Sequence, residues 1–434
     1  MQLKFIFRAM RHRNYRLFIC GQSISLIGTW MQQVAMSWLV YRLTNSALLL
    51  GVVGFAGQIP SFLLAPLAGV IADRHHRHRI LLMTQTSAML QAVVLSVLVL
   101  NHQIAVWHIL VLSVFLGLVN AFDMPIRQSF MVEMIEKRED LSNAIALNSS
   151  IVNMARLVGP SIAGVLIALV GEGMCFLLNA ASYIAVIAAL MAMKITPKKI
   201  LPKREHVLHD LKEGFLYAFG FTPIKSILLL LSLVSLMGVP YQVLMPVFAR
   251  DIFHGGPKTL GFLMAMSGSG ALAGAIYLAS RKSVIGLGRM IAVTTGVFGL
   301  GMVIFALSNA LWFSLVVVGV SGFSMMVQMA ASNTILQTIV EEDKRGRVMS
   351  FYTMSIIGMT PFGSLMAGTL ADRIGAPATL LIGGVCCVLG AAIFVRKLPA
   401  IRAKVRPIYI KKGIIPEVVS GIGAASEPDA LPKK

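Results

Sequence analysis

The chain has 434 residues, of which 57% are hydrophobic and only 13% are charged, and its formal net charge is +20. Soluble domains carry about 25% charged residues, so this composition excludes an ordinary soluble protein and is typical of a protein embedded in a membrane. The positive charges lie in the gaps between apolar stretches rather than in one basic domain. We therefore expect the lipid bilayer, and no nucleic acid, as the partner of most of the chain.

Long uncharged blocks follow one another along the chain. No Asp, Glu, Lys or Arg occurs in 17–41, 43–72, 80–122, 226–249, 259–280, 290–340, 348–371 or 374–395. A helix needs about 20 apolar residues to cross a bilayer core of about 30 Å, so 80–122 and 290–340 hold two helices each, divided near Asn101 and Asn309. Segments 141–171 and 173–193 add two more. The blocks predict an all-α membrane protein with twelve transmembrane helices.

Lys and Arg concentrate in the first 16 residues, in alternate gaps between the helices and in the C-terminal tail. Because such an excess marks the cytoplasmic side of a membrane, both termini are expected in the cytoplasm. The longest polar gap divides the chain into two bundles of six helices. The expected parts are a first bundle (1–194), a cytoplasmic linker with an amphipathic helix (195–225), a second bundle (226–396) and a largely disordered cytoplasmic tail (397–434).

A weak internal repeat relates the two halves. Gly164, Leu166 and Gly171 recur 204 residues later as Gly368, Leu370 and Gly375, near the ends of the fifth and eleventh helices. Together with the symmetrical helix count, the repeat favours a transporter built from two pseudo-symmetric six-helix bundles.

The loop between the second and third helices reads GVIADRHHRHRILL from Gly69 to Leu82. It resembles the signature that the major facilitator superfamily carries in the same loop. The matching positions are Gly69, Asp73, Arg74 and Arg77. The resemblance implies a cytoplasmic latch, in which Asp73 accepts hydrogen bonds from the free N–H groups that open the eleventh helix. It also implies that Arg77 pairs with an acid on the fourth helix, and Asp123 lies near the required depth. A solvated basic turn that only sets topology is the alternative.

Three histidines, His75, His76 and His78, interrupt this loop. A metal site is not expected, because the flanking arginines repel a cation and the spacing fixes no coordination geometry. Protonation near neutral pH is the other role open to them. A second string of the same kind, GTLADRIG at 368–375, lies on the outer face by the helix count, and we interpret it as a helix end rather than a second latch.

Residues 121–167 resemble one branch of the superfamily, the transmembrane secretion effectors, which include enterobactin and macrolide exporters. The likeness rests on Asp123-x-Pro125-x-Arg127, Asn143-Ala144, Ala155-Arg156 and Gly159-Pro160. It implies a secondary active exporter that works by alternating access in the bacterial inner membrane, functions as a monomer and exchanges protons for a small amphipathic molecule such as a drug, siderophore or secondary metabolite. No cofactor beyond the proton gradient is implied, and Asp123 is the candidate coupling carboxylate.

The alternative functions are an importer or facilitator, a membrane-embedded enzyme and a sensor. An importer or facilitator of the same fold differs only in direction. A membrane-embedded enzyme is disfavoured, because the chain carries neither HExxH nor GxSxG and no pair of intramembrane carboxylates. A sensor would require an additional soluble domain.

Arg156 lies about halfway along the fifth predicted helix. A charge at that depth costs roughly 2.5–3.5 kcal/mol on insertion scales, so the side chain is expected to face the bundle interior. It would serve as an anchor for an anionic substrate group or as a partner for a carboxylate. The alternative is a structural role, in which it caps carbonyl groups near the Gly159-Pro160 kink.

The superfamily lines its central cavity with helices 1, 4, 7 and 10, which implies a set of polar candidates here. They are Gln22, Thr29, Gln33, Asn120, Tyr241, Gln242, Gln328 and Asn333. Gly159, Pro160 and Gly164 are the candidates for a helix kink and for close contact between the bundles.

Overall fold

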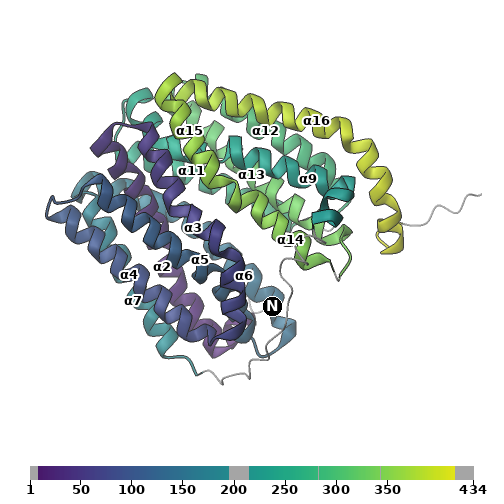
Figure 1. Ribbon diagram of the computed structural model, residues 1–434, viewed down its shortest axis with the longest axis horizontal. Helices are drawn as coiled ribbons and strands as arrows, with labels where there is room; N and C mark the ends of the chain where they lie inside the picture. The colour runs from purple at the N-terminus through teal and green to yellow at the C-terminus, as the bar shows by residue number, and fades with distance from the viewer. Residues whose placement is uncertain (1–7, 195–214, 282, 343, 416–434) are drawn as a thin grey trace, which may run out of the picture.

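The protein consists of long helices joined by short turns (Figure 1). The computed structural model describes residues 8–194, 215–281, 283–342 and 344–415, and only the backbone of residues 65–74 and Arg138. The N-terminal bundle contains η1 Arg8–Arg11, α2 Arg13–Thr44, α3 Ala47–Arg74, α4 Arg77–Leu100, α5 Val106–Glu133, η2 Arg138–Asp140, α6 Leu141–Val170 and α7 Glu172–Met191. The C-terminal bundle contains α9 Thr222–Leu233, η3 Val234–Gly238, α10 Tyr241–Val247, η4 Phe248–Ile252, α11 Pro257–Ala279, α12 Leu287–Leu307, α13 Leu311–Ile339, α14 Arg345–Thr353, η5 Met354–Gly358, α15 Thr360–Ile374 and α16 Ala376–Lys411.

The predicted membrane fold is confirmed. Among the described residues, eleven helical segments are long and apolar enough to cross a bilayer, with α9 to η4 forming one span and α14 to α15 another. The remaining long helix is α2, whose 32 residues include Gln22, Gln32 and Gln33 and so give a more polar span. Both long blocks divide as predicted, because α4 and α12 end just before Asn101 and Asn309.

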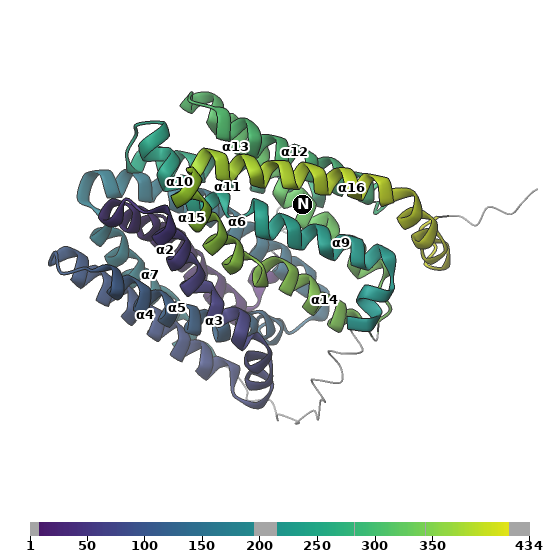
Figure 2. The same cartoon turned by 45° about the horizontal axis from the view of Figure 1, so that its top comes forward.

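The helix ends define two faces of the molecule. The face that carries the beginning of α2 and the end of α16 is called the terminal face below, and it also carries the first turns of α4, α6 and α12. The opposite face carries the turns after α2, α4, α6, η4, α12 and α15. The two bundles adjoin at one end and diverge at the other, where α14 and the last turns of α16 lie (Figures 1 and 2).

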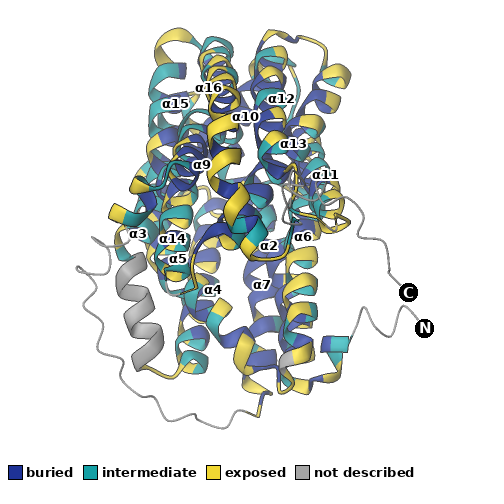
Figure 3. Ribbon diagram, turned by 90° about the vertical axis from the view of Figure 1, so that its right-hand side faces the viewer, coloured by how far each residue is buried: buried dark blue, intermediate teal, exposed yellow. Residues whose placement is uncertain are grey.

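The hydrophobic core changes along the direction of the helices. Toward the opposite face, one core includes residues of both bundles, for example Trp38 of α2 packed with Tyr241 and Phe248. Toward the terminal face it separates into a core within the N-terminal bundle and another within the C-terminal bundle. Buried residues gather where helices face each other, and exposed residues follow the outer helix surfaces (Figure 3). The bundles are thus packed together in one half and separate in the other.

Glycines allow the bundles to meet closely at two equivalent places. A Cβ atom on Gly368 of α15 would lie 2.8 Å from Cα of Gly51 in α3, and one on Gly261 of α11 would lie 2.8 Å from Cα of Gly164 in α6. Gly51 and Gly261 are each the fifth residue of their helices. The repeat read in the sequence, which pairs Gly164 with Gly368, therefore reflects a two-fold arrangement of helix contacts between the bundles.

The seventh and eleventh spans are broken near mid-depth. In the seventh, a π-turn at η3 precedes Pro240, whose missing N–H and ring cannot continue a regular helix. In the eleventh, the π-turn η5 precedes Pro361 at the start of α15. The uncharged blocks predict both spans as continuous helices, although their prolines were a signal for these breaks.

The expected disorder of the tail from residue 397 was wrong for its first part. α16 continues to Lys411, through Pro399 and Pro407. The extension is held because Leu398, Val405 and Tyr409 recur on one helix face and are buried against the C-terminal bundle. The polar and proline content of the segment concealed this apolar stripe.

The predicted amphipathic helix of the linker falls mainly outside the described residues, which resume at Phe215. Residues 215–220 are helical, and the ring of Phe215 stacks on Phe219 with centroids 4.4 Å apart.

Candidate functional site

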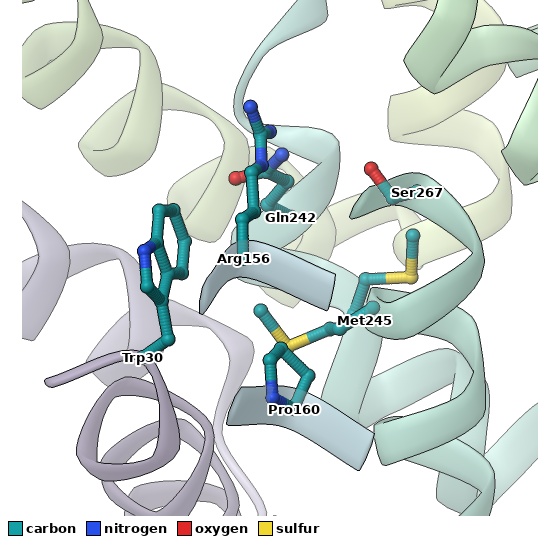
Figure 4. Close-up of a pocket in the computed structure, with 7 residues that line it drawn as sticks. Trp30, Arg156, Pro160, Gln242, Met245 and Ser267 are labelled. Atoms are coloured by element: carbon teal, nitrogen blue, oxygen red, sulfur yellow. The ribbon is translucent and has the colours of Figure 1, made fainter. Parts of the chain in front are cut away.

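A small pocket lies between the two bundles at mid-depth (Figure 4). Its lining comes from α2 and α6 of the N-terminal bundle and from α10 and α11 of the C-terminal bundle. The lining residues are Trp30, Arg156, Pro160, Gln242, Met245, Met264 and Ser267. The pocket has room for about one water molecule. The pocket joins both bundles but, in this conformation, cannot hold a whole organic ligand.

Arg156 is the charged residue of this pocket. It is the sixteenth of the 30 residues of α6, and its guanidinium lies over the Trp30 ring, 5.5 Å from the centroid. Within the part of the chain that the structure describes, it has no carboxylate or carbonyl partner, and none of the seven lining residues is acidic. The alternative that Arg156 caps carbonyl groups near Pro160 therefore finds no hydrogen bond in support.

Asp123 lies nearer the terminal face and entirely within the N-terminal bundle. Its side chain is buried and accepts hydrogen bonds from Thr84 Oγ1 at 2.9 Å and Gln85 Nε2 at 2.7 Å, both from α4. Arg127, one turn further along α5, places Nη2 3.5 Å from Oδ2 of Asp123. The carboxylate therefore ties α4 to α5, and it contributes nothing to the lining of the Arg156 pocket.

Arg77 pairs with an acid on the fourth transmembrane helix, α5, as the resemblance implied, but that acid is Glu133 rather than Asp123. Arg77 Nη1 lies 2.7 Å from Oε1 of Glu133 at the terminal end of α5, whereas Asp123 is ten residues, or about 15 Å of helix, away from that end. The apolar block had suggested that the fourth span ends near Asp123, but α5 continues to Glu133. Gly69, Asp73 and Arg74, which carry the rest of the predicted latch, are described only in their backbone.

The three histidines of that loop differ in their surroundings. His78 Nε2 lies 2.8 Å from the carbonyl oxygen of Leu190, at the end of α7. His75 and His76 are exposed.

The bundles are joined by polar contacts at the opposite face. The Tyr41 hydroxyl donates to Asp251, Arg250 Nη1 donates to Asn45 Oδ1 at 2.6 Å, and Ser46 Oγ donates to Asp372 Oδ1 at 3.4 Å. In the described ranges, every hydrogen bond that we find between the bundles belongs to this set. We call it the opposite-face lock; its residues are Tyr41, Asn45, Ser46, Arg250, Asp251 and Asp372.

Sequence reasoning missed this lock. Asp372 belongs to the GTLADRIG string, which from the sequence alone is interpreted only as a helix end. Its position on the opposite face was foreseen, but its contact with Ser46 depends on how α15 packs on α3. The signal in the sequence that could have indicated this lock is the charged residues that flank the seventh and eleventh spans, namely Arg250, Asp251 and Asp372.

The predicted cavity residues separate into three groups. Gln242 lines the Arg156 pocket, and the Tyr241 hydroxyl lies beside it, 2.6 Å from Ser267 Oγ. Gln33 and Asn120 are exposed, and Thr29 donates to the carbonyl of Ser25 in its own helix. The third group does not line the pocket. It consists of Gln22 in α2 and of Gln328 and Asn333 in α13.

Gln328 occupies the position in the C-terminal bundle that corresponds to Asp123. Each is the eighteenth residue of its helix, and Thr84 and Thr294 are each the eighth residue of theirs. The Gln328 side chain is 1% exposed, and neither of its amide atoms has a hydrogen-bond partner among the described residues. A carboxylate with partners in one half thus corresponds to an unpartnered amide in the other.

The other two kink and contact candidates have distinct roles. α6 continues as one helix through Pro160, and Gly159 lets it approach α2, because a Cβ there would lie 2.6 Å from Cβ of Trp30. Gly164 forms the contact between the bundles described above.

Comparison with known proteins places these features in a family. Residues 6–411 match the family described as transmembrane secretion effector. The chain is 26% identical over 380 residues to the staphyloferrin A transporter of Staphylococcus aureus, covering 87% of this chain and 95% of that protein. It is 23% identical to macrolide efflux protein A of Streptococcus pyogenes (88% and 96% covered) and 26% identical to the multidrug efflux pump Tap of Mycolicibacterium fortuitum (82% and 88%).

Solved structures share the fold. A bacterial homologue of the human lysosomal transporter Spinster, in an inward-facing and unoccupied conformation, superposes with a TM-score of 0.66 at 15% identity, covering 92% of this chain and 98% of that chain. A POT family transporter in complex with a thioalcohol-conjugated peptide gives a TM-score of 0.71 at 11% identity, with 90% and 96% covered.

Proposed function

Because this chain belongs to the transmembrane secretion effector family of the major facilitator superfamily, and is therefore a membrane transporter rather than an enzyme, we propose that it exports a small amphipathic molecule by alternating access. The observation that carries the proposal is the division of the hydrophobic core. One core joins the bundles toward the opposite face, and two separate cores lie toward the terminal face. A rocking motion about the mid-depth contacts would exchange the joined half with the separate half.

The proposal places the terminal face in the bacterial cytoplasm, because Lys and Arg concentrate there. The conformation described here would then be open to the cytoplasm, ready to load a substrate for export. The opposite-face lock would close the outer side, and the protein would act as a monomer, because each monomer contains both bundles.

Export is tested by comparing cells that do and do not produce the protein. A panel of fluorescent amphiphilic dyes should accumulate less in producing cells, and an uncoupler that collapses the proton gradient should remove the difference. Equal accumulation of every dye in both cells would contradict the proposal. Higher accumulation in the producing cells would indicate import instead.

We propose Asp123 as the proton-coupling carboxylate. It is a buried acid within the N-terminal bundle, and protonation would weaken both its contact with Arg127 and the carboxylate hydrogen bonds that tie α4 to α5. Asp123→Asn should abolish dye export against a gradient while the protein remains folded and inserted. The matched control is Glu136→Gln, which removes an exposed acid just beyond α5 at the terminal face and should retain gradient-driven export. Continued uphill export by Asp123→Asn would assign coupling to another group.

A further inference from the structure

The Arg156 pocket carries a positive charge, and no acidic side chain of the described residues lies in its lining. A guanidinium remains charged at every accessible pH and offers five N–H donors in a planar fork. The Trp30 ring covers it at 5.5 Å, but a ring face accepts no full hydrogen bond from the fork. With no acid in the lining, the donors that face the pocket are available to a ligand.

The C-terminal bundle supplies neutral polar groups to the same space. Gln242 and Ser267 line the pocket, and Tyr241 contacts Ser267 through its hydroxyl. In Figure 4 the Arg156 side chain from α6 extends toward Gln242. A single anionic group could therefore contact both bundles, with its charge on the N-terminal side and hydrogen bonds from the C-terminal side.

The rest of the lining is apolar and adaptable. Met245 and Met264 have flexible side chains, and Pro160 presents a ring without an N–H donor. The pocket lies at the depth where the shared core gives way to the two separate cores. Since it has room for about one water molecule, only the anionic end of a ligand would enter it, and the apolar part would extend toward the terminal face.

We propose that the substrate class of this transporter is an amphiphile carrying a carboxylate or a similar planar oxyanion, which pairs with Arg156 between the two bundles. The proposal rests on the proposed function and names its substrate class. A guanidinium and a carboxylate match in two parallel hydrogen bonds, a geometry that a neutral amide cannot reproduce with the same strength.

The same arrangement links substrate binding to the conformational change. Closing both halves around an empty pocket would enclose an unpaired charge, which is unfavourable at low dielectric. A bound oxyanion neutralises it. The loaded protein should therefore pass through the closed state more readily than the empty protein, which prevents unproductive cycling.

The test uses two probes of nearly the same size and shape, the anionic 1-naphthylacetate and the neutral 1-naphthylacetamide, with the purified full-length protein. The wild type should bind the acid with a Kd at least about tenfold lower than the amide, the scale of a charge-assisted hydrogen bond. Arg156→Gln should bind the two probes equally, and Arg156→Lys should keep a reduced preference because it retains a charge without the planar fork.

Arg281→Gln is the matched control, because Arg281 lies on the terminal face and donates to the Ile285 carbonyl, away from the pocket. It should keep the wild-type preference. Equal affinities in the wild type, no binding of the acid, or a preference that survives Arg156→Gln would overturn the proposal. The wild-type comparison decides this even if a variant fails to fold. A preserved preference without export would instead contradict the proposed function.

Discussion

Asp123 and Arg156 differ in which groups contact their charge. Asp123 is held by Thr84, Gln85 and Arg127 within one bundle, whereas Arg156 has an aromatic ring on one side and faces a pocket shared by both bundles. In the proposed mechanism, Asp123 would exchange a proton within one bundle. Arg156 would instead respond to a ligand that enters the contact between the bundles. Proton and substrate would therefore act at separate places.

Asp140 provides a test outside the membrane-spanning segments. His12 Nε2 lies 2.9 Å from Oδ2 of Asp140, and Arg8 also pairs with it, so that η1 is fastened to the beginning of α6. The hydrogen bond from His12 and the nearby charge of Arg8 hold the pKa of Asp140 below its usual value near 3.8. A lowered pKa means that the folded state favours the ionised carboxylate, so the stabilisation is present above that usual value and is lost as the pH falls through the folded-state pKa.

Asp140→Asn should therefore lower the Tm of the purified protein by a few degrees at pH 7. The difference from wild type should persist down to about pH 4 and shrink below it. Thermal unfolding measured across this pH range checks the prediction, with Glu139→Gln as the neighbouring control. A difference that did not change between pH 6 and pH 3 would show that the ionised carboxylate is not the stabilising group.

At the scale of elements, the glycine contacts determine where the bundles can touch. Gly51 with Gly368 and Gly164 with Gly261 bring pairs of helices to backbone contact, and backbone atoms cannot move aside as a flexible side chain can. These contacts involve α3, α6, α11 and α15, which would therefore have to slide or separate in the proposed opening of the joined half.

Gly368→Leu should prevent the opposite face from closing. An added Cβ would lie 2.7 Å from the Ala47 carbonyl oxygen and 2.8 Å from Gly51 Cα. We expect at least about a tenfold loss of export, in the range of 1.4 kcal/mol or more, with membrane insertion retained. Gly346→Leu, at a position where a Cβ meets no atom within 4 Å, should keep export. Wild-type export by Gly368→Leu would show that this contact is not needed for closure.

At the scale of the whole molecule, two bundles share one core at one end and separate into two at the other. The opposite-face lock adds its hydrogen bonds where the core is shared. If transport requires this end to open, then fastening it should stop transport without unfolding either bundle.

The pair Ser46→Cys and Asp372→Cys allows that experiment, because the two native side chains approach to 3.4 Å. The four native cysteines are first replaced, and a short bifunctional thiol reagent with a cleavable disulfide then joins the pair. Linked protein should lose export and regain it after reduction. Each single-cysteine variant treated in the same way should be unaffected. Export by the linked protein would contradict alternating access through the opposite face.

The sequence by itself determined the number of helices, the division of the two long apolar blocks near Asn101 and Asn309, and the family. Apolar length and the positions of charge follow directly from what a bilayer permits, so they can be read without knowing which helices are neighbours. The same reasoning selected Arg156 and Gly164, because a charge or a small residue inside an apolar helix has few roles.

Only the tertiary structure decided what these residues contact. The partner of Arg77 is Glu133 rather than Asp123, the lock joins residues more than 200 positions apart, and α16 continues to Lys411. Each depends on how far a helix extends and which surface it packs against, and local composition specifies neither. The charge of Arg156 was evident from the sequence, but the absence of an acid in its pocket depends on the packing of four helices from two bundles.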